Sequence, residues 1–104
     1  MSKDEVFARI DDDEPRLVEI AEDLWDNPEL GLHEEESAER LIEALSAEGF
    51  DVERGVGGMP TAFVATYGDE GPTIGILGEY DALPGLSQSV TAEKDPIEAG
   101  GPGH

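Results

Sequence analysis

Residues 73–80 limit the possible folds more than any other stretch of the chain, because they predict a strand that is apolar on both faces. Ile74, Ile76 and Leu77 place large side chains on both sides of this strand, with glycines between and beside them. Strands that are covered on both faces occur in sheets that have helices on each side. The stretch therefore predicts the central strand of an α/β domain, and such a strand needs neighbouring strands.

The rest of the chain predicts two helices and two further strands. The expected elements are a helix over about 15–26, a helix over about 34–48 and strands over 51–54, 61–67 and 73–80, with loop from Pro84 onward. Pro15 is expected to separate a short lead-in from the first helix, because proline inside a helix costs about 3 kcal/mol. Gly49 is placed to stop the second helix. The predicted fold class is an incomplete α/β domain, with two helices and then three strands.

The charge of the chain excludes several classes of partner. The chain has 26 acidic and 6 basic residues, for a net charge of −20. Nucleic acid and anionic membrane surfaces require a basic protein surface, so neither is an expected partner. The acids are spread along the whole chain among ordinary hydrophobic patterning, which predicts a halophilic surface rather than a disordered tail. With no cysteine, no long apolar run and no basic leader, the expected location is the cytoplasm.

Two carboxylates follow the predicted central strand. Glu79 and Asp81 lie two residues apart at its carboxyl end, the edge of an open α/β sheet where ligands usually bind. Side chains two apart in a strand point the same way, so both could face one metal ion or one reacting group. The alternative is chance, since a chain with 26 acids will place two near some strand end.

The two histidines differ in their expected roles. His33 stands beside three glutamates at a predicted helix start and is expected to be a solvated surface residue. His104 follows Gly100-Gly101-Pro102-Gly103, and a glycine-rich loop that ends in histidine is a common lead-in to a metal site. Carboxylates would have to complete any metal site that these two histidines make. The glycine-rich ending also predicts that the chain is truncated.

Other types of site lack the residues they require. Gly55-Val56-Gly57-Gly58 precedes no predicted helix and no Lys-Ser/Thr pair, so it does not predict a phosphate loop. Ser87 and Ser89 have no nucleophile-elbow pattern around them, and there is no cysteine nucleophile.

Three stretches together resemble the start of a known enzyme family. They are Leu24-Trp25-Asp26-Asn27-Pro28-Glu29-Leu30-Gly31, Pro60-Thr61-Ala62-Phe63-Val64-Ala65 and the loop from Gly78 to Gln88. From about Ile10 through His104, the chain resembles the N-terminal part of a metal-dependent amidohydrolase of the aminoacylase and carboxypeptidase type. Within that family it is most similar to the aminobenzoyl-glutamate hydrolase branch. The resemblance implies the α/β/α catalytic domain of a zinc peptidase.

The resemblance assigns roles to three residues. Asp81 would support the metal ligands without binding metal itself. Glu79 stands where classical relatives have a metal-binding histidine and this branch has an acid, so it is a weaker candidate. His104 matches the first histidine of a Gly-His-small-Cys-Gly-His motif, whose cysteine and second histidine bind metal. Because those ligands are not among the 104 residues, the implied pair of zinc or manganese ions is expected only in a full-length enzyme.

The resemblance also implies a reaction and an assembly. The full-length enzyme would hydrolyse a small N-acyl or aminobenzoyl amino-acid amide and would be a homodimer. Residues 1–104 would form only the first part of the catalytic domain, without the dimerisation domain, and would be inactive alone. The alternative function is an acidic, non-catalytic binding module built on the same helix and sheet scaffold.

The charge predicts that folding depends on salt. The Debye length falls to about 3 Å at 1 M salt, so concentrated KCl would screen most of the repulsion among the carboxylates. In a KCl titration followed by circular dichroism, the helical signal should increase with salt. A fully folded chain in dilute buffer would contradict this prediction.

Overall fold

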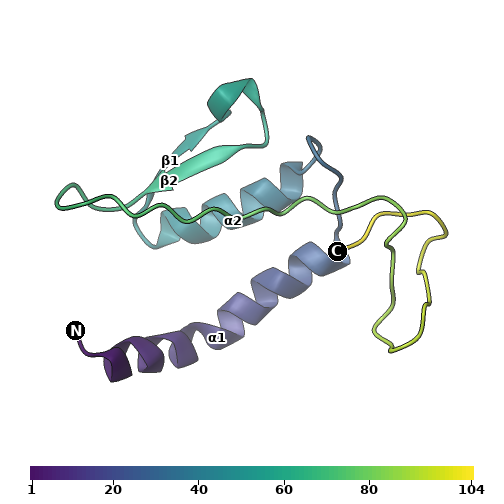
Figure 1. The fold of residues 1–104 in the computed structure, drawn as a ribbon, viewed down its shortest axis with the longest axis horizontal. Helices are drawn as coiled ribbons and strands as arrows, with labels where there is room; N and C mark the ends of the chain where they lie inside the picture. The colour runs from purple at the N-terminus through teal and green to yellow at the C-terminus, as the bar shows by residue number, and fades with distance from the viewer.

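The computed structural model describes all 104 residues and has an α/β architecture (Figure 1). The elements, in chain order, are helix α1 (Lys3–Asp26), helix α2 (Glu35–Ala47), strand β1 (Asp51–Arg54), the short 3-10 helix η1 (Val56–Gly58) and strand β2 (Phe63–Thr66). The predicted order of two helices followed by strands is confirmed for these elements.

Helix α1 is continuous, so the predicted separation at Pro15 is wrong. Its N-cap is Ser2, whose hydroxyl accepts a hydrogen bond from the Glu5 amide while the Glu5 carboxylate accepts one from the Ser2 amide. This capping box stabilises helix well before the proline. Arg9 pairs with Asp13 one turn later, at 2.8 Å. Pro15 removes one amide donor from the helix, but its φ angle is compatible with helical backbone.

Helix α2 provides most of the small core. Ala38 and Ile42 lie on its buried face, and Ala82 from the later loop is the third buried apolar residue. The helix ends as predicted near Gly49, which has a φ of 89° and donates its amide to the Ser46 carbonyl. Phe50 then returns its amide to the Leu45 carbonyl at 3.2 Å. Glycine fits this left-handed position because it has no Cβ.

Arginine ion pairs connect α2 to its neighbours. Arg16 and Arg40 join α1 and α2 through Glu48 and Asp23. Arg54 of β1 binds both carboxylate oxygens of a single α2 residue, Glu39, at 2.6 and 3.0 Å. These pairs are largely exposed, so each contributes little in water and less in salt.

Strands β1 and β2 form a two-stranded antiparallel sheet. The register pairs Asp51 with Thr66 and Arg54 with Phe63. Beyond the strand ends, the Phe50 and Tyr67 rings pack with their centroids 5.2 Å apart. The sheet therefore confirms the predicted strands at 51–54 and 61–67, with the second strand shortened at both ends.

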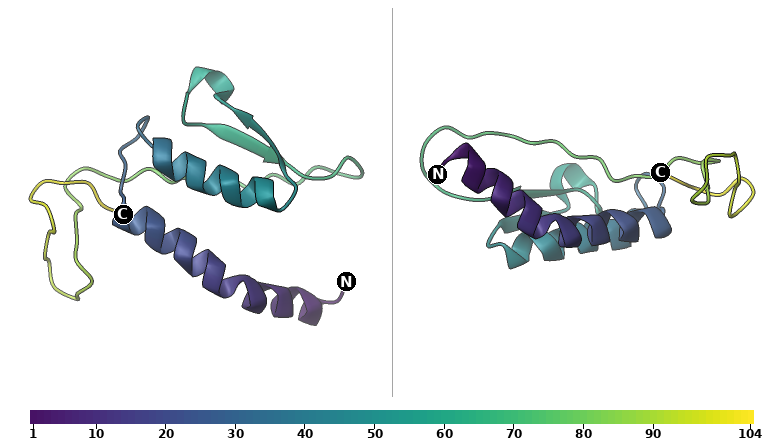
Figure 2. Two further views of the ribbon diagram at one scale, coloured as in Figure 1. Left: turned by 180° about the vertical axis from the view of Figure 1, so that it is seen from behind. Right: turned by 90° about the horizontal axis from the view of Figure 1, so that it is seen from below.

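Residues 73–80 do not form the predicted third strand. They run extended past the sheet and α2, and Figure 2 shows that they stand away from both helices when seen from below. Ile74, Ile76 and Leu77 are 85%, 95% and 92% exposed. A strand needs hydrogen-bonded neighbours on its edges, and no segment of the structure lies beside this one to supply them.

The open shape of the molecule follows from the small core. Only eight residues are buried, and the radius of gyration of 16.3 Å exceeds the roughly 13 Å that is typical of a compact domain of this length. None of the helices combines the length and apolar character that crossing a bilayer requires.

Candidate functional site

Asp81 lies where the extended segment meets the turn between the two helices. The next residue, Ala82, donates its amide to the Glu29 carbonyl at 2.7 Å, and a parallel bridge joins Leu30 with Ala82. Ala82 is only 2% exposed, whereas the Asp81 carboxylate is on the surface beside Gly31. The buried alanine thus fixes the backbone that presents Asp81 to solvent.

Glu29 holds this turn against the start of α2. Its carboxylate accepts hydrogen bonds from the Ser37 amide and hydroxyl, each at 2.6 Å, and from the Glu36 amide at 3.1 Å. The N-cap residue Glu34 makes no such bond with its own side chain, so Glu29 caps the helix from a distance. Burial raises the pKa of Glu29, but these hydrogen bonds outweigh burial and leave the pKa below its ordinary value.

Glu34 is a buried carboxylate next to Asp81. It is 7% exposed and accepts hydrogen bonds from the Thr61 hydroxyl and the Leu32 amide. A Cβ placed on Gly31 would lie 3.7 Å from a Glu34 oxygen and 3.9 Å from an Asp81 oxygen. Both carboxylates therefore lie near the position that a side chain at residue 31 would occupy.

Tyr80 connects the same region to the sheet. Its hydroxyl donates to the Thr61 carbonyl, and its ring stacks on Phe63 with centroids 5.9 Å apart. Burial, reinforced by the negative charge of Glu34, raises the pKa of the Tyr80 hydroxyl. The phenol therefore remains a neutral donor at physiological pH.

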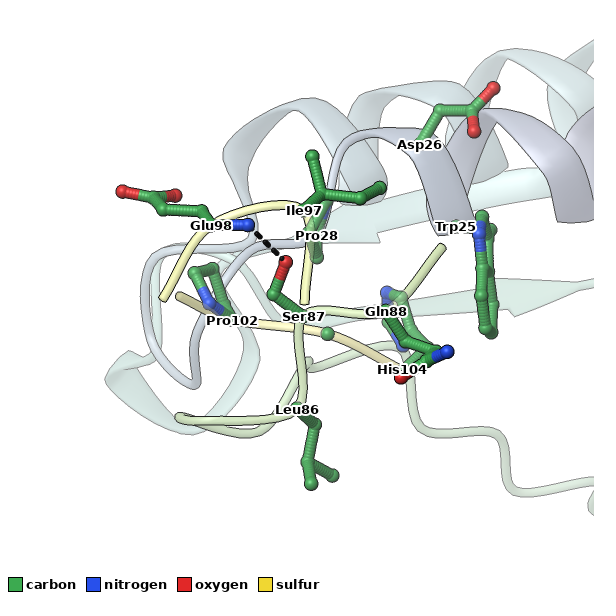
Figure 3. A pocket seen from close by; sticks show the side chains of 11 residues that line it. Trp25, Asp26, Pro28, Leu86, Ser87, Gln88, Ile97, Glu98, Pro102 and His104 are labelled. Atoms are coloured by element: carbon green, nitrogen blue, oxygen red, sulfur yellow. Dashed lines mark hydrogen bonds between the residues drawn. The ribbon is translucent and has the colours of Figure 1, made fainter. Parts of the chain in front are cut away.

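The loop after Asp81 returns to bring His104 close to the same turn. Leu83 and Gly103 exchange backbone hydrogen bonds at 2.9 and 3.0 Å. A Cβ on Gly103 would overlap the carbonyl group of Leu86, so only glycine fits there. His104 follows and contributes to a pocket of about 260 Å³, whose wall also includes Trp25 and Gln88 (Figure 3).

The predicted site residues all lie on the surface of the molecule. Glu79, Asp81 and His104 are all exposed, and His33 is exposed, as expected for a surface histidine. No set of three or more histidine, aspartate and glutamate side chains is arranged to hold a metal ion. The residues present do not fit a complete metal centre.

Sequence reasoning missed the positions of Glu29 and Glu34. Glu29 belongs to a stretch that carries the family resemblance, and Glu34 is favourably placed near a predicted helix start, but neither pattern predicts their contacts. The available signal is local: a glutamate follows the Asn-Pro helix end, and the N-cap residue of the second helix is Glu34 rather than Ser, Thr, Asp or Asn. Such a helix start needs a cap from elsewhere.

Comparison with known proteins relates these features to a family of hydrolases. No protein-family model matches the chain. One subunit of the p-aminobenzoyl-glutamate hydrolase of Escherichia coli is 45% identical to it over 105 residues, which cover 96% of this chain and 22% of that protein. The chain is a relative of this hydrolase. Thermostable carboxypeptidase 2 of Saccharolobus solfataricus is 34% identical over 70 residues, which cover 65% of this chain and 18% of that protein.

The similarity to these two hydrolases confirms the resemblance that the sequence motifs predict. The α/β arrangement of the chain is consistent with part of such a peptidase domain. The chain spans about a fifth of the length of either hydrolase relative.

The shifted pKa of Glu29 predicts loss of stability in acid. A carboxyl group with a lowered pKa in the folded state stabilises the fold above its unfolded pKa, and this contribution is lost as the pH falls through the folded pKa. Glu29→Ala should lower the free energy of unfolding by about 1 kcal/mol at neutral pH. It should also flatten the dependence of thermal stability on pH below the ordinary glutamate pKa. The exposed Glu70→Ala is the control, and identical pH profiles for the two variants would refute the capping role.

The close approach of Gly103 to the Leu86 carbonyl predicts that alanine will not fit at position 103. Gly103→Ala should break the paired hydrogen bonds between Leu83 and Gly103, so the Leu83 amide should exchange with solvent much faster. Gly75→Ala is a matched control, because a Cβ there meets no atom within 4 Å. Hydrogen exchange followed by NMR compares the two variants with the parent chain. Unchanged protection of Leu83 in Gly103→Ala would contradict the predicted close approach.

Proposed function

We propose that residues 1–104 form the first part of the catalytic domain of a metal-dependent amidohydrolase. The observation that carries the proposal is the placement of Asp81. It stands on a backbone fixed by Glu29 and Ala82, in a chain 45% identical to a hydrolase subunit over nearly its whole length. The substrate would be a small N-acyl or aminobenzoyl amino-acid amide. The reaction is hydrolysis of its C–N amide bond.

The proposed roles belong to residues of the segment that meets the turn between α1 and α2, and to His104. Asp81 would orient metal ligands, Glu79 is a weaker candidate, and His104 would open the metal-binding motif. The zinc or manganese pair would take its ligands from outside residues 1–104, since the resemblance gives the cysteine and the second histidine of the motif that role and neither is among these residues. A full-length enzyme would be a cytoplasmic homodimer, and its dimerisation domain would also lie outside these residues.

A non-catalytic binding module is the second candidate function. The observation in its favour is the exposed apolar segment at 73–78, which offers a backbone edge to another polypeptide. A stable partner complex at native salt, formed by a protein without hydrolase activity, would support this second function instead of the first.

The proposal predicts that the 104-residue chain alone does not hydrolyse N-acyl amino acids or aminobenzoyl-glutamate, with either Zn²⁺ or Mn²⁺ added. The protein purified from its source should be active. Asp81→Asn introduced into that protein should lower kcat/KM by roughly 10–100-fold, which is the usual effect of removing a group that orients metal ligands.

Asp69→Asn is the control, because Asp69 is an exposed acid at the other end of the same extended segment. Release of the free amino acid measures the rate for each protein. Metal-dependent hydrolysis by the pure 104-residue chain would contradict the assignment of the metal ligands. Equal rates for the two variants would contradict the role of Asp81.

A further inference from the structure

Glu34 uses both oxygens of a buried side chain to join two segments that are distant in the sequence. One oxygen accepts a hydrogen bond from the Leu32 amide, and the other accepts one from the Thr61 hydroxyl. Glu34 and Thr61 are each 7% exposed. A buried carboxylate needs donors of this kind, since burial without them is costly. The side chain therefore links the turn before α2 to the residues before β2.

The turn that Glu34 holds contains a strained residue. Leu32 has a φ of 69° and is the one non-glycine residue of the chain with a positive φ. A leucine is disfavoured there because its Cβ approaches the following carbonyl oxygen. Its side chain is largely exposed, so the turn is held by the bond from the His33 amide to the Leu30 carbonyl, at 2.9 Å, and by the bond to Glu34. Loss of the Glu34 side chain would therefore let the turn relax.

The residues on both sides of Asp81 are attached to the same two segments. Before Asp81, the Tyr80 hydroxyl donates to the Thr61 carbonyl. After Asp81, Ala82 forms a parallel bridge with Leu30, at the start of the turn. A closed ring of contacts thus runs from the buried carboxylate through one segment to Tyr80, and then through Asp81 and Ala82 back to the turn. Asp81 is the exposed residue of this ring, whereas the carboxylate that closes the ring is buried.

We propose that Glu34 is a positioning residue, which holds the backbone on both sides of Asp81. It would not touch a substrate itself, because it is buried and both of its oxygens accept hydrogen bonds from protein donors. This role rests on the proposed function, in which Asp81 orients metal ligands. It is distinct from the contact of Glu29, whose carbonyl accepts the amide of Ala82.

Four variants of the full-length protein separate the contacts of Glu34. Glu34→Ala removes both hydrogen bonds. Glu34→Gln can keep both, because its carbonyl accepts from the Leu32 amide and the Thr61 hydroxyl can turn to accept from the side-chain amide. Thr61→Val removes one bond and keeps the β-branched shape. Glu35→Ala is the matched control, since Glu35 is the next residue and is exposed.

Hydrogen exchange followed by mass spectrometry is the first measurement. In Glu34→Ala and Thr61→Val, the peptide that contains the Ala82 amide should exchange at least about tenfold faster than in the parent protein. Glu34→Gln and Glu35→Ala should exchange like the parent. Peptides of α1 are the internal reference and should be unchanged in all four variants. Thr61→Val decides the question if Glu34→Ala unfolds the whole protein.

Rates of amide hydrolysis then show whether Glu34 acts through Asp81. Glu34→Ala should lower kcat/KM by roughly tenfold or more, and Glu34→Gln by less than about twofold. Added to Asp81→Asn, Glu34→Ala should cause no further loss, because both changes remove the same function. A residue that acts independently of Asp81 would lower the rate by the same factor in both backgrounds.

Two results would overturn the role of Glu34. One is unchanged exchange at Ala82 in both Glu34→Ala and Thr61→Val. The other is an equal loss of rate from Glu34→Ala with and without Asp81→Asn. A parent protein without hydrolase activity would instead overturn the proposed function, and the exchange measurement would still show whether Glu34 holds the backbone around Asp81.

Discussion

The arrangement around Asp81 depends on one residue, Glu29. Its carboxylate caps α2 through Ser37 and Glu36, while its carbonyl accepts the amide of Ala82. One residue thereby joins the turn after α1, the start of α2 and the loop that carries Asp81. Because the buried core is small, these directed hydrogen bonds fix the positions of elements that apolar packing alone would leave loosely defined.

The acidic composition affects both the scaffold and its surface. The few arginines connect α1 to α2 and α2 to β1 through exposed ion pairs, which are weak individually. Most of the remaining carboxylates are exposed and belong to no ion pair. Screening by salt therefore acts mainly by reducing repulsion among acids, while the apolar contacts of the core are little affected.

Local patterns predicted α2, its glycine stop, the β1–β2 pair and the α/β class, because each depends on residues close together in the chain. The same reasoning failed at Pro15, where a capping box at Ser2 supports a helix that passes through the proline. It also failed at 73–80, where apolar composition indicates a strand but no neighbouring strand is present to pair with it. The sequence did predict Asp81 as a candidate for the site after an extended segment, and Asp81 is exposed there. Its connection to Glu29 was not predictable, because a cap supplied from outside the helix leaves no periodic signal.

The most direct test of this account is residue-specific hydrogen exchange on the 104-residue chain at a salt concentration that gives the full helical signal. If Glu29 joins these elements, the amides of Ala82, Glu36 and Ser37 will be protected together and will open with the same free energy. The amides of residues 73–78 will exchange without protection in the same experiment. Exchange of Ala82 at the rate of residues 73–78, with Ser37 still protected, would show that the Asp81 loop is not held by Glu29.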